Sequence, residues 1–174
     1  MSISEFVSRL NRTIEEIERD RPADTLKITL DTLALVKRRV INTGKDKDGK
    51  QFGKYSRAVV PYWFYRGKET NRGNSTAVAQ LLRQFGYFAS YQDWRTVNNL
   101  PTDFINFSFT NKMWNSLGPA VDSDSAGRTV VVVKAKTENE GKKVGYQNAR
   151  FGDILALSKS ERELLTNLNN SRII

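Results

Sequence analysis

The sequence predicts an α+β fold in which N-terminal helices pack on an antiparallel sheet with a long β-hairpin, and a short C-terminal helix closes the chain. Apolar residues recur at helical spacing through the first 42 residues, a valine-rich run covers 129–136, and a capping signature begins at residue 158. A length of 174 residues, with 39% hydrophobic and 27% charged residues, fits a single domain spanning 1–174.

Two helices are expected at the N-terminus. Ser2 and Glu5 have the spacing of a capping box, so the first helix is expected to begin there. Pro22 lacks a backbone donor and disfavours helical geometry in the residue before it, which predicts a break. A second helix is expected over 24–42, with Gly44 as its stop.

The segment 45–50 is polar and contains an Asp-Gly pair, which predicts a tight, exposed turn. Asp46 and Asp48 ahead of Gly49 are also typical of a calcium-binding EF-hand loop. With Gly49 at the sixth position of such a loop, the twelfth position is Tyr55 rather than a carboxylate, so an ordinary turn is the better interpretation.

Residues 57–100 are predicted to be an aromatic-rich insertion or arm with a short helix at 77–85. Such a segment fits a contact surface as well as a core, and the sequence alone leaves both open. Its aromatic residues are Tyr62, Trp63, Phe64, Tyr65, Phe85, Tyr87, Phe88, Tyr91 and Trp94, and its basic residues include Arg66, Lys68, Arg72, Arg83 and Arg95.

A strand is expected at 104–109, followed by a short helix that Thr110 caps and that carries Met113, Trp114 and Leu117. The hairpin should follow, with one strand around Val121, a turn at 123–127 and the second strand at 129–136. Helices are then expected at 138–150 and 159–168, the latter because Ser158 and Glu161 repeat the capping spacing.

Lys and Arg number 28 against 19 Asp and Glu, and the resulting formal charge of +9 suits an acidic or polyanionic partner. The absence of Cys and His removes the usual ligands of zinc, haem and iron-sulfur sites and the histidine partner of a nucleophile. Most familiar hydrolase mechanisms are thereby excluded. We expect a non-enzymatic protein without cofactor or metal. No stretch has the length of a membrane span or the layout of a secretory signal, so a soluble protein made in a cytoplasm is expected.

Two other functions are weighed against this expectation. Glu140-Gly141-Lys142, with Asp122 or Asp124 upstream, is similar to the acidic and lysine grouping of metal-dependent nucleases, although solvated charge explains it better. The aromatic and basic residues of 57–100 could bind single-stranded nucleic acid by stacking and phosphate contact. Protein contact or core packing is preferred there.

Three segments, 48–56, 107–117 and 151–158, carry short motifs in a fixed order. Together they resemble the virion morphogenesis proteins of tailed bacteriophages, the tail-completion and neck (head-tail connector) proteins. The resemblance covers 25–56 and 104–165, and Asn111 stands where the middle motif of the family has glycine. The matching residues are Asp48, Gly49, Lys50, Phe52, Tyr55, Ser56, Thr110, Met113, Ser116, Leu117, Phe151, Gly152, Leu155, Leu157 and Ser158.

The resemblance implies a structural subunit that forms a homo-oligomeric ring at the head-tail junction of a virion, after synthesis in the bacterial cytoplasm. Portal, adaptor, stopper or tail-tube proteins would be its neighbours, with packaged DNA in transit as a further contact. We expect the contacts between subunits at Tyr62, Trp63, Phe64, Tyr65, Phe85, Tyr87, Phe88, Tyr91 and Trp114. We expect a basic docking surface, for an acidic partner ring or DNA, at Lys37, Arg38, Arg39, Lys45, Lys47, Lys50 and Lys54.

Overall fold

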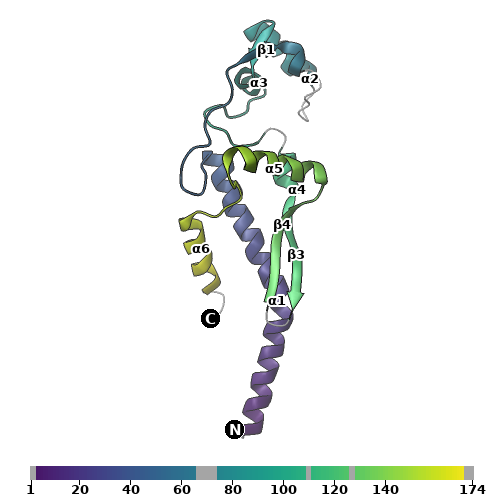
Figure 1. Cartoon of the computed structure of the whole chain (residues 1–174), viewed down its shortest axis with the longest axis vertical. Helices are drawn as coiled ribbons and strands as arrows, with labels where there is room; N and C mark the ends of the chain where they lie inside the picture. Colours follow the sequence, from purple (N-terminus) through teal and green to yellow (C-terminus); the bar gives the residue numbers. More distant parts are fainter. Residues whose placement is uncertain (1–2, 66–73, 109–110, 126–127, 171–174) are drawn as a thin grey trace.

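The computed structural model describes residues 3–65, 74–108, 111–125 and 128–170. Its fold is α+β, as predicted, and its strands pair into two antiparallel two-stranded sheets. The molecule is elongated, with β1, α2 and α3 at one end and the start of α1 at the other (Figure 1). The elements are α1 (Ile3–Thr43), β1 (Val59–Pro61), the 3-10 helix η1 (Tyr62–Tyr65), α2 (Asn74–Phe85), β2 (Phe88–Ser90), α3 (Tyr91–Val97), α4 (Lys112–Ser116), β3 (Leu117–Ser125), β4 (Arg128–Ala135), α5 (Glu138–Phe151) and α6 (Lys159–Asn170).

One continuous helix, α1, replaces the two predicted N-terminal helices, so the predicted break at Pro22 is wrong. Pro22 has no N–H to donate to the carbonyl of Glu18, four residues earlier. Glu18 is exposed, so water can bond that carbonyl in place of the missing donor. The loss of one hydrogen bond therefore stays local, and the helix continues on both sides of the proline.

The end of α1 follows the prediction. Gly44 has a φ of 61°, and its amide donates to the carbonyl of Val40 at 3.0 Å. A side chain at Gly44 would overlap the ring of Phe104, so the position requires glycine for space as well as for conformation. The next turn is tight and exposed, as predicted, because Oδ1 of Asp46 accepts the backbone amide of Lys50 at 2.8 Å.

The predicted hairpin is formed by β3 and β4, which pair from Leu117 with Ala135 to Ser125 with Arg128. The register shifts between Val121 and Ser123, which marks a bulge in β3. Both strands lie along α1 (Figure 1). Helix α5 lies at the open end of the hairpin, where β3 begins and β4 ends. We call this assembly of 23–56 and 101–170 the body.

The predicted helices of the body are present with small changes of boundary. Leu117 begins β3 instead of closing the short helix before it. The capping box before α6 is confirmed, since the amide of Ser158 donates to Oε2 of Glu161 at 2.8 Å and the amide of Glu161 donates to Oγ of Ser158 at 3.2 Å.

The strand predicted near 104–109 is absent from the part of it that the structure describes, residues 104–108. Phe107 has a φ of 53°, which breaks extended geometry. The buried side chain of Asn106 is hydrogen bonded within the segment and to its surroundings instead of pairing in a ladder: its Oδ1 accepts the amide of Ser108 at 3.1 Å and the hydroxyl of Tyr55 at 2.8 Å. The alternation of apolar residues therefore reflects a packed loop.

The core of the body brings the three motif segments together. Phe52, Phe107 and Phe151 pack edge to face. The ring centroid of Phe107 lies 4.8 Å from that of Phe52 and 5.1 Å from that of Phe151. Their cluster is completed by residues of α1, α4, β3 and the segment after α5 that are buried: Leu33, Val36, Val40, Met113, Trp114, Leu117 and Ile154. Segments about 50 residues apart in the sequence thus share one core.

Residues 57–100, which we call the aromatic lobe, have a core of their own. Tyr65 and Trp94 stack with ring centroids 5.2 Å apart, and Ala77, Leu81 and Ala89 surround them. Ser90 and Asp93 form a capping box that begins α3. The described residues of this segment thus form a small folded unit rather than an extended arm, because Tyr65 and Trp94 bury each other in its core.

Several predicted features lie outside the described residues. They are the capping residues Ser2 and Thr110, the end of the predicted strand at Phe109, the turn glycine Gly127, and the basic residues Arg66, Lys68 and Arg72.

Replacing Pro22 by alanine is expected to stabilise α1 by up to about 3 kcal/mol, because it restores one helical hydrogen bond and removes the clash of the ring with the preceding turn. Thermal unfolding followed by circular dichroism would show a higher midpoint with no loss of helical signal. Ala23→Gly is the matched control and should lower the stability by about 1 kcal/mol. A lower midpoint for Pro22→Ala would contradict this account of α1.

Candidate functional site

Four large rings of the aromatic lobe are exposed, and together we call them the exposed aromatic surface. Trp63, Phe64, Tyr87 and Phe88 are each more than half exposed, from 53% for Phe64 to 70% for Tyr87. Tyr62 lies beside two of them, since its ring is 5.8 Å from that of Trp63 and 6.0 Å from that of Tyr87. Large exposed rings on one small unit are typical of a protein contact.

The other predicted contact residues occupy different environments. Tyr65 and Trp114 are each 1% exposed and belong to the cores of the lobe and the body, so the prediction that they contact a partner is corrected. Burial raises the pKa of Tyr65 to about 12. Phe85 is 37% exposed at the end of α2, and Tyr91 is half-buried at the junction of the lobe with the body.

A second apolar surface lies on the N-terminal part of α1, which extends beyond the body (Figure 1). Val7, Leu10, Ile14 and Ile17 are 46–61% exposed and recur every three or four residues, so they form one stripe. The sequence indicated apolar residues at helical spacing here, in a helix that was expected to pack on the sheet. What only the structure reveals is that no other element reaches residues 7–17 within the described chain.

Arg39, which was predicted to belong to the basic surface, forms contacts within the body instead. Arg39 is partly covered by α6, with 13% of its side chain exposed: its Nε donates to Oε1 of Glu161 at 2.9 Å, and its Nη1 and Nη2 donate to the carbonyls of Lys45 (2.7 Å) and Ala156 (2.6 Å). The guanidinium therefore joins α1, the 45–51 turn and α6, and the prediction that it docks a partner is corrected.

The remaining predicted cations are nearer to solvent. Burial, with a smaller contribution from Lys136, lowers the pKa of Lys37, which is half-buried. The other five are exposed and gather at the end of α1 and in the turn after it: Arg38, Lys45, Lys47, Lys50 and Lys54.

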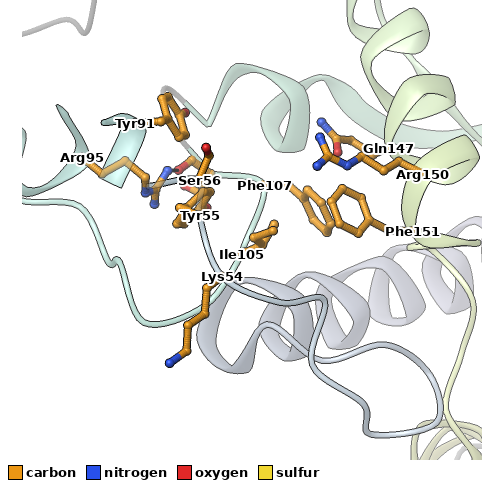
Figure 2. A pocket seen from close by; sticks show the side chains of 11 residues that line it. Lys54, Tyr55, Ser56, Tyr91, Arg95, Ile105, Phe107, Gln147, Arg150 and Phe151 are labelled. Carbon is orange, nitrogen blue, oxygen red and sulfur yellow. Dashed lines mark hydrogen bonds between the residues drawn. The ribbon is translucent and has the colours of Figure 1, made fainter. Parts of the chain in front are cut away.

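A hydrogen-bond network holds the junction between the lobe and the body. Arg95 of α3 is 1% exposed, and its guanidinium carbon lies 4.0 Å from the centre of the Tyr55 ring (Figure 2). Its donors reach the carbonyls of Pro101 (2.8 Å) and Ser108 (2.7 Å) and Oδ1 of Asn106 (3.2 Å). Burial raises the pKa of Tyr55, despite the nearby hydrogen bonds and the charge of Arg95. Arg95 is thus part of the junction and not of the aromatic surface.

The acidic residues proposed for a nuclease are used in ion pairs. Asp122 pairs with Lys134 at 2.9 Å on the hairpin, and Glu140 pairs with Lys143 at 2.8 Å within α5. Within the described residues, no group of three or more acidic side chains lies close enough together to hold a metal ion.

Comparison with known proteins adds no relative to the structural description. No family model, no curated protein and no solved structure matches this chain. In the described part of the chain, no helix combines the length and the apolar character that a membrane crossing needs.

Glu161→Gln is expected to destabilise the fold by about 2 kcal/mol at neutral pH, because it leaves the partly buried guanidinium of Arg39 without its carboxylate. Burial alone would raise the pKa of Glu161, but hydrogen bonds from Ser158 and Arg39 together hold it below its usual value of 4.5. A group whose folded pKa is lowered stabilises the fold above the unfolded pKa and loses that effect as the pH falls through the folded pKa.

The difference in stability between wild type and Glu161→Gln should therefore be constant above about pH 5 and shrink below the unfolded value of 4.5. Chemical unfolding at several pH values measures it. Glu163→Gln is the control, since Glu163 is exposed and 4.0 Å from Lys159, and should change stability by less than about 0.5 kcal/mol. A pH-independent difference would rule out a role for the charge of Glu161.

Proposed function

We propose that this protein is a non-enzymatic structural subunit of a tailed-bacteriophage virion that assembles into a ring at the head-tail junction. The observation that carries the proposal is the meeting of the three motif segments in one core, through Phe52, Phe107 and Phe151. Apolar side chains in mutual contact of this kind make up one contiguous core. The resemblance noted in the sequence therefore concerns residues that act together in this fold.

The conformation of Asn111 supports the same resemblance. This residue stands where the family has glycine, and it has a φ of 58° and a ψ of 3°, in the left-handed region that glycine adopts most readily. Asparagine is among the few other residues that tolerate this region. The substitution is thus compatible with the backbone that a glycine in the family motif would favour.

Two exposed apolar surfaces of the described residues support assembly as the function. The exposed aromatic surface lies at one end of the molecule and the stripe of α1 at the other (Figure 1). In a closed ring each subunit meets its neighbours through two different surfaces, which suits this arrangement. Aromatic side chains usually contribute most of the binding energy at such contacts. The exposed cations after α1 would then face an acidic surface of a neighbouring ring.

The double variant Trp63→Ala, Phe64→Ala is expected to weaken self-assembly by at least about tenfold, because two large anchors are lost at once. Sedimentation velocity over a range of concentrations would measure the assembly. Circular dichroism should show an unchanged fold, since both side chains are more than half exposed.

Tyr146→Ala is the matched control, because Tyr146 is 73% exposed on α5, away from the aromatic surface. It should assemble like the wild type. Equal assembly of the double variant and the wild type would remove the aromatic surface from the proposal. Absence of the protein from purified virions would remove the proposed location.

A further inference from the structure

The part of α1 that extends beyond the body has the residue spacing of a coiled coil (Figure 1). Its exposed apolar residues follow one another at intervals of three, four and three positions: Val7, Leu10, Ile14 and Ile17. This alternation corresponds to the repeat of about 3.5 residues that keeps an apolar stripe directed at one neighbouring helix along its length. The stripe therefore fits a second helix of the same spacing.

The stripe presents apolar area that no other described segment covers. Its side chains are 46–61% exposed, and within the described chain no other element reaches residues 7–17. A helix packed along the stripe would remove much of this area from water, which is favourable in proportion to the area removed. A second copy of the chain carries the same stripe and can supply that helix.

Charge along the same stretch of α1 changes sign near the middle of the stripe. Residues 5–13 include two arginines and one glutamate, a net charge of +1. Residues 14–21 include four carboxylates and two arginines, a net charge of −2. A second copy that runs antiparallel to the first therefore places opposite charges side by side, whereas a parallel copy in register places like charges side by side.

The side chains that carry this excess charge are not neutralised within the helix. Among the described residues, Arg9 and Arg12 have no carboxylate within 4.0 Å. In the same part of the chain, Glu15 and Glu16 have no cation within that distance. All four side chains are exposed, so their charges are available to a partner helix.

We propose that α1 pairs through residues 7–17 with the same stretch of a second copy, and that the two helices run antiparallel. With the pair centred midway along the stripe, Val7 lies opposite Ile17 of the second copy. Leu10 then lies opposite Ile14 of the second copy. Each apolar side chain of one helix thus meets one of the other, as the layers of a coiled coil require. The spacing selects a helix as the partner, and the charges select the direction.

This pairing goes beyond the proposed ring, because it assigns the stripe one partner and one direction. Each copy contributes the same residues, so the contact has two-fold symmetry. It leaves the exposed aromatic surface, at the other end of the molecule, available to a different neighbour (Figure 1). The pairing depends neither on the virion nor on that surface, so the purified chain is sufficient to test it.

The chain contains no cysteine, so single introduced cysteines report which residues meet. Val7→Cys and Ile17→Cys proteins, one of them carrying a mass tag, are mixed under mild oxidation. We expect a disulfide-linked dimer that contains one of each, because the two positions face each other in the antiparallel pair. Neither protein alone should form a linked dimer, since equal positions would lie about 15 Å apart at a rise of 1.5 Å per residue. Denaturing electrophoresis without reductant measures the products.

A mixture of Arg12→Cys and Arg19→Cys is the matched control, because both positions lie on the face of α1 opposite the stripe. It should give no linked dimer. Linked dimers of Val7→Cys alone and of Ile17→Cys alone would show a parallel pair and overturn the proposed direction. No linkage in the Val7→Cys and Ile17→Cys mixture, or equal linkage in the control, would overturn the pairing itself.

Sedimentation velocity of the same samples separates this pairing from the proposed ring. Linkage in a protein that forms nothing larger than a dimer would support the pairing and count against the ring. Larger assemblies without linkage would support the ring and overturn the pairing.

Discussion

Burial of one stripe of α1 supports most of this structure. Leu33, Val36 and Val40 lie on one face of its C-terminal half, and the hairpin, α4 and the segment after α5 all pack against that face. Burying each of these side chains contributes roughly 1.5–3 kcal/mol relative to leaving it exposed. The N-terminal half of the same helix carries a stripe of similar character that is exposed and that no other described segment covers. One helix thus serves as the centre of a core and as an unpartnered surface.

The aromatic residues of 57–100 divide between two roles for a geometric reason. Tyr65 and Trp94 stack face to face between short elements, which leaves space for few other rings inside so small a unit. Trp63 and Tyr87 remain outside, next to the half-buried Tyr62. A chain segment of this length cannot bury all of its rings, so its excess aromatic area becomes surface.

Arg39, which is partly buried, and Arg95, which is buried, show how charge is used within the fold. Arg39 has a carboxylate partner in Glu161 and joins three segments of the body. Arg95 also joins segments, but its partners are carbonyl and amide oxygens and the ring of Tyr55. The planar guanidinium can bond in several directions at once, whereas lysine presents a single charged point. The exposed lysines near the end of α1 therefore remain available to solvent and partners.

Local patterns in the sequence were sufficient to predict the α+β class, the hairpin, the capping box of α6 and the turn after Gly44. Each of these depends on residues within a few positions of one another, so propensity and spacing determine them. The continuity of α1 through Pro22 and the loop around Asn106 were decided by solvent access and by distant partners, which no local pattern records. The division of the aromatic rings between core and surface, the contact of Arg39 with Glu161 and the hydrogen bonds of Arg95 at the junction likewise depend on contacts between segments far apart in the chain. Only the tertiary structure decides such contacts, because they exist only after the segments have packed.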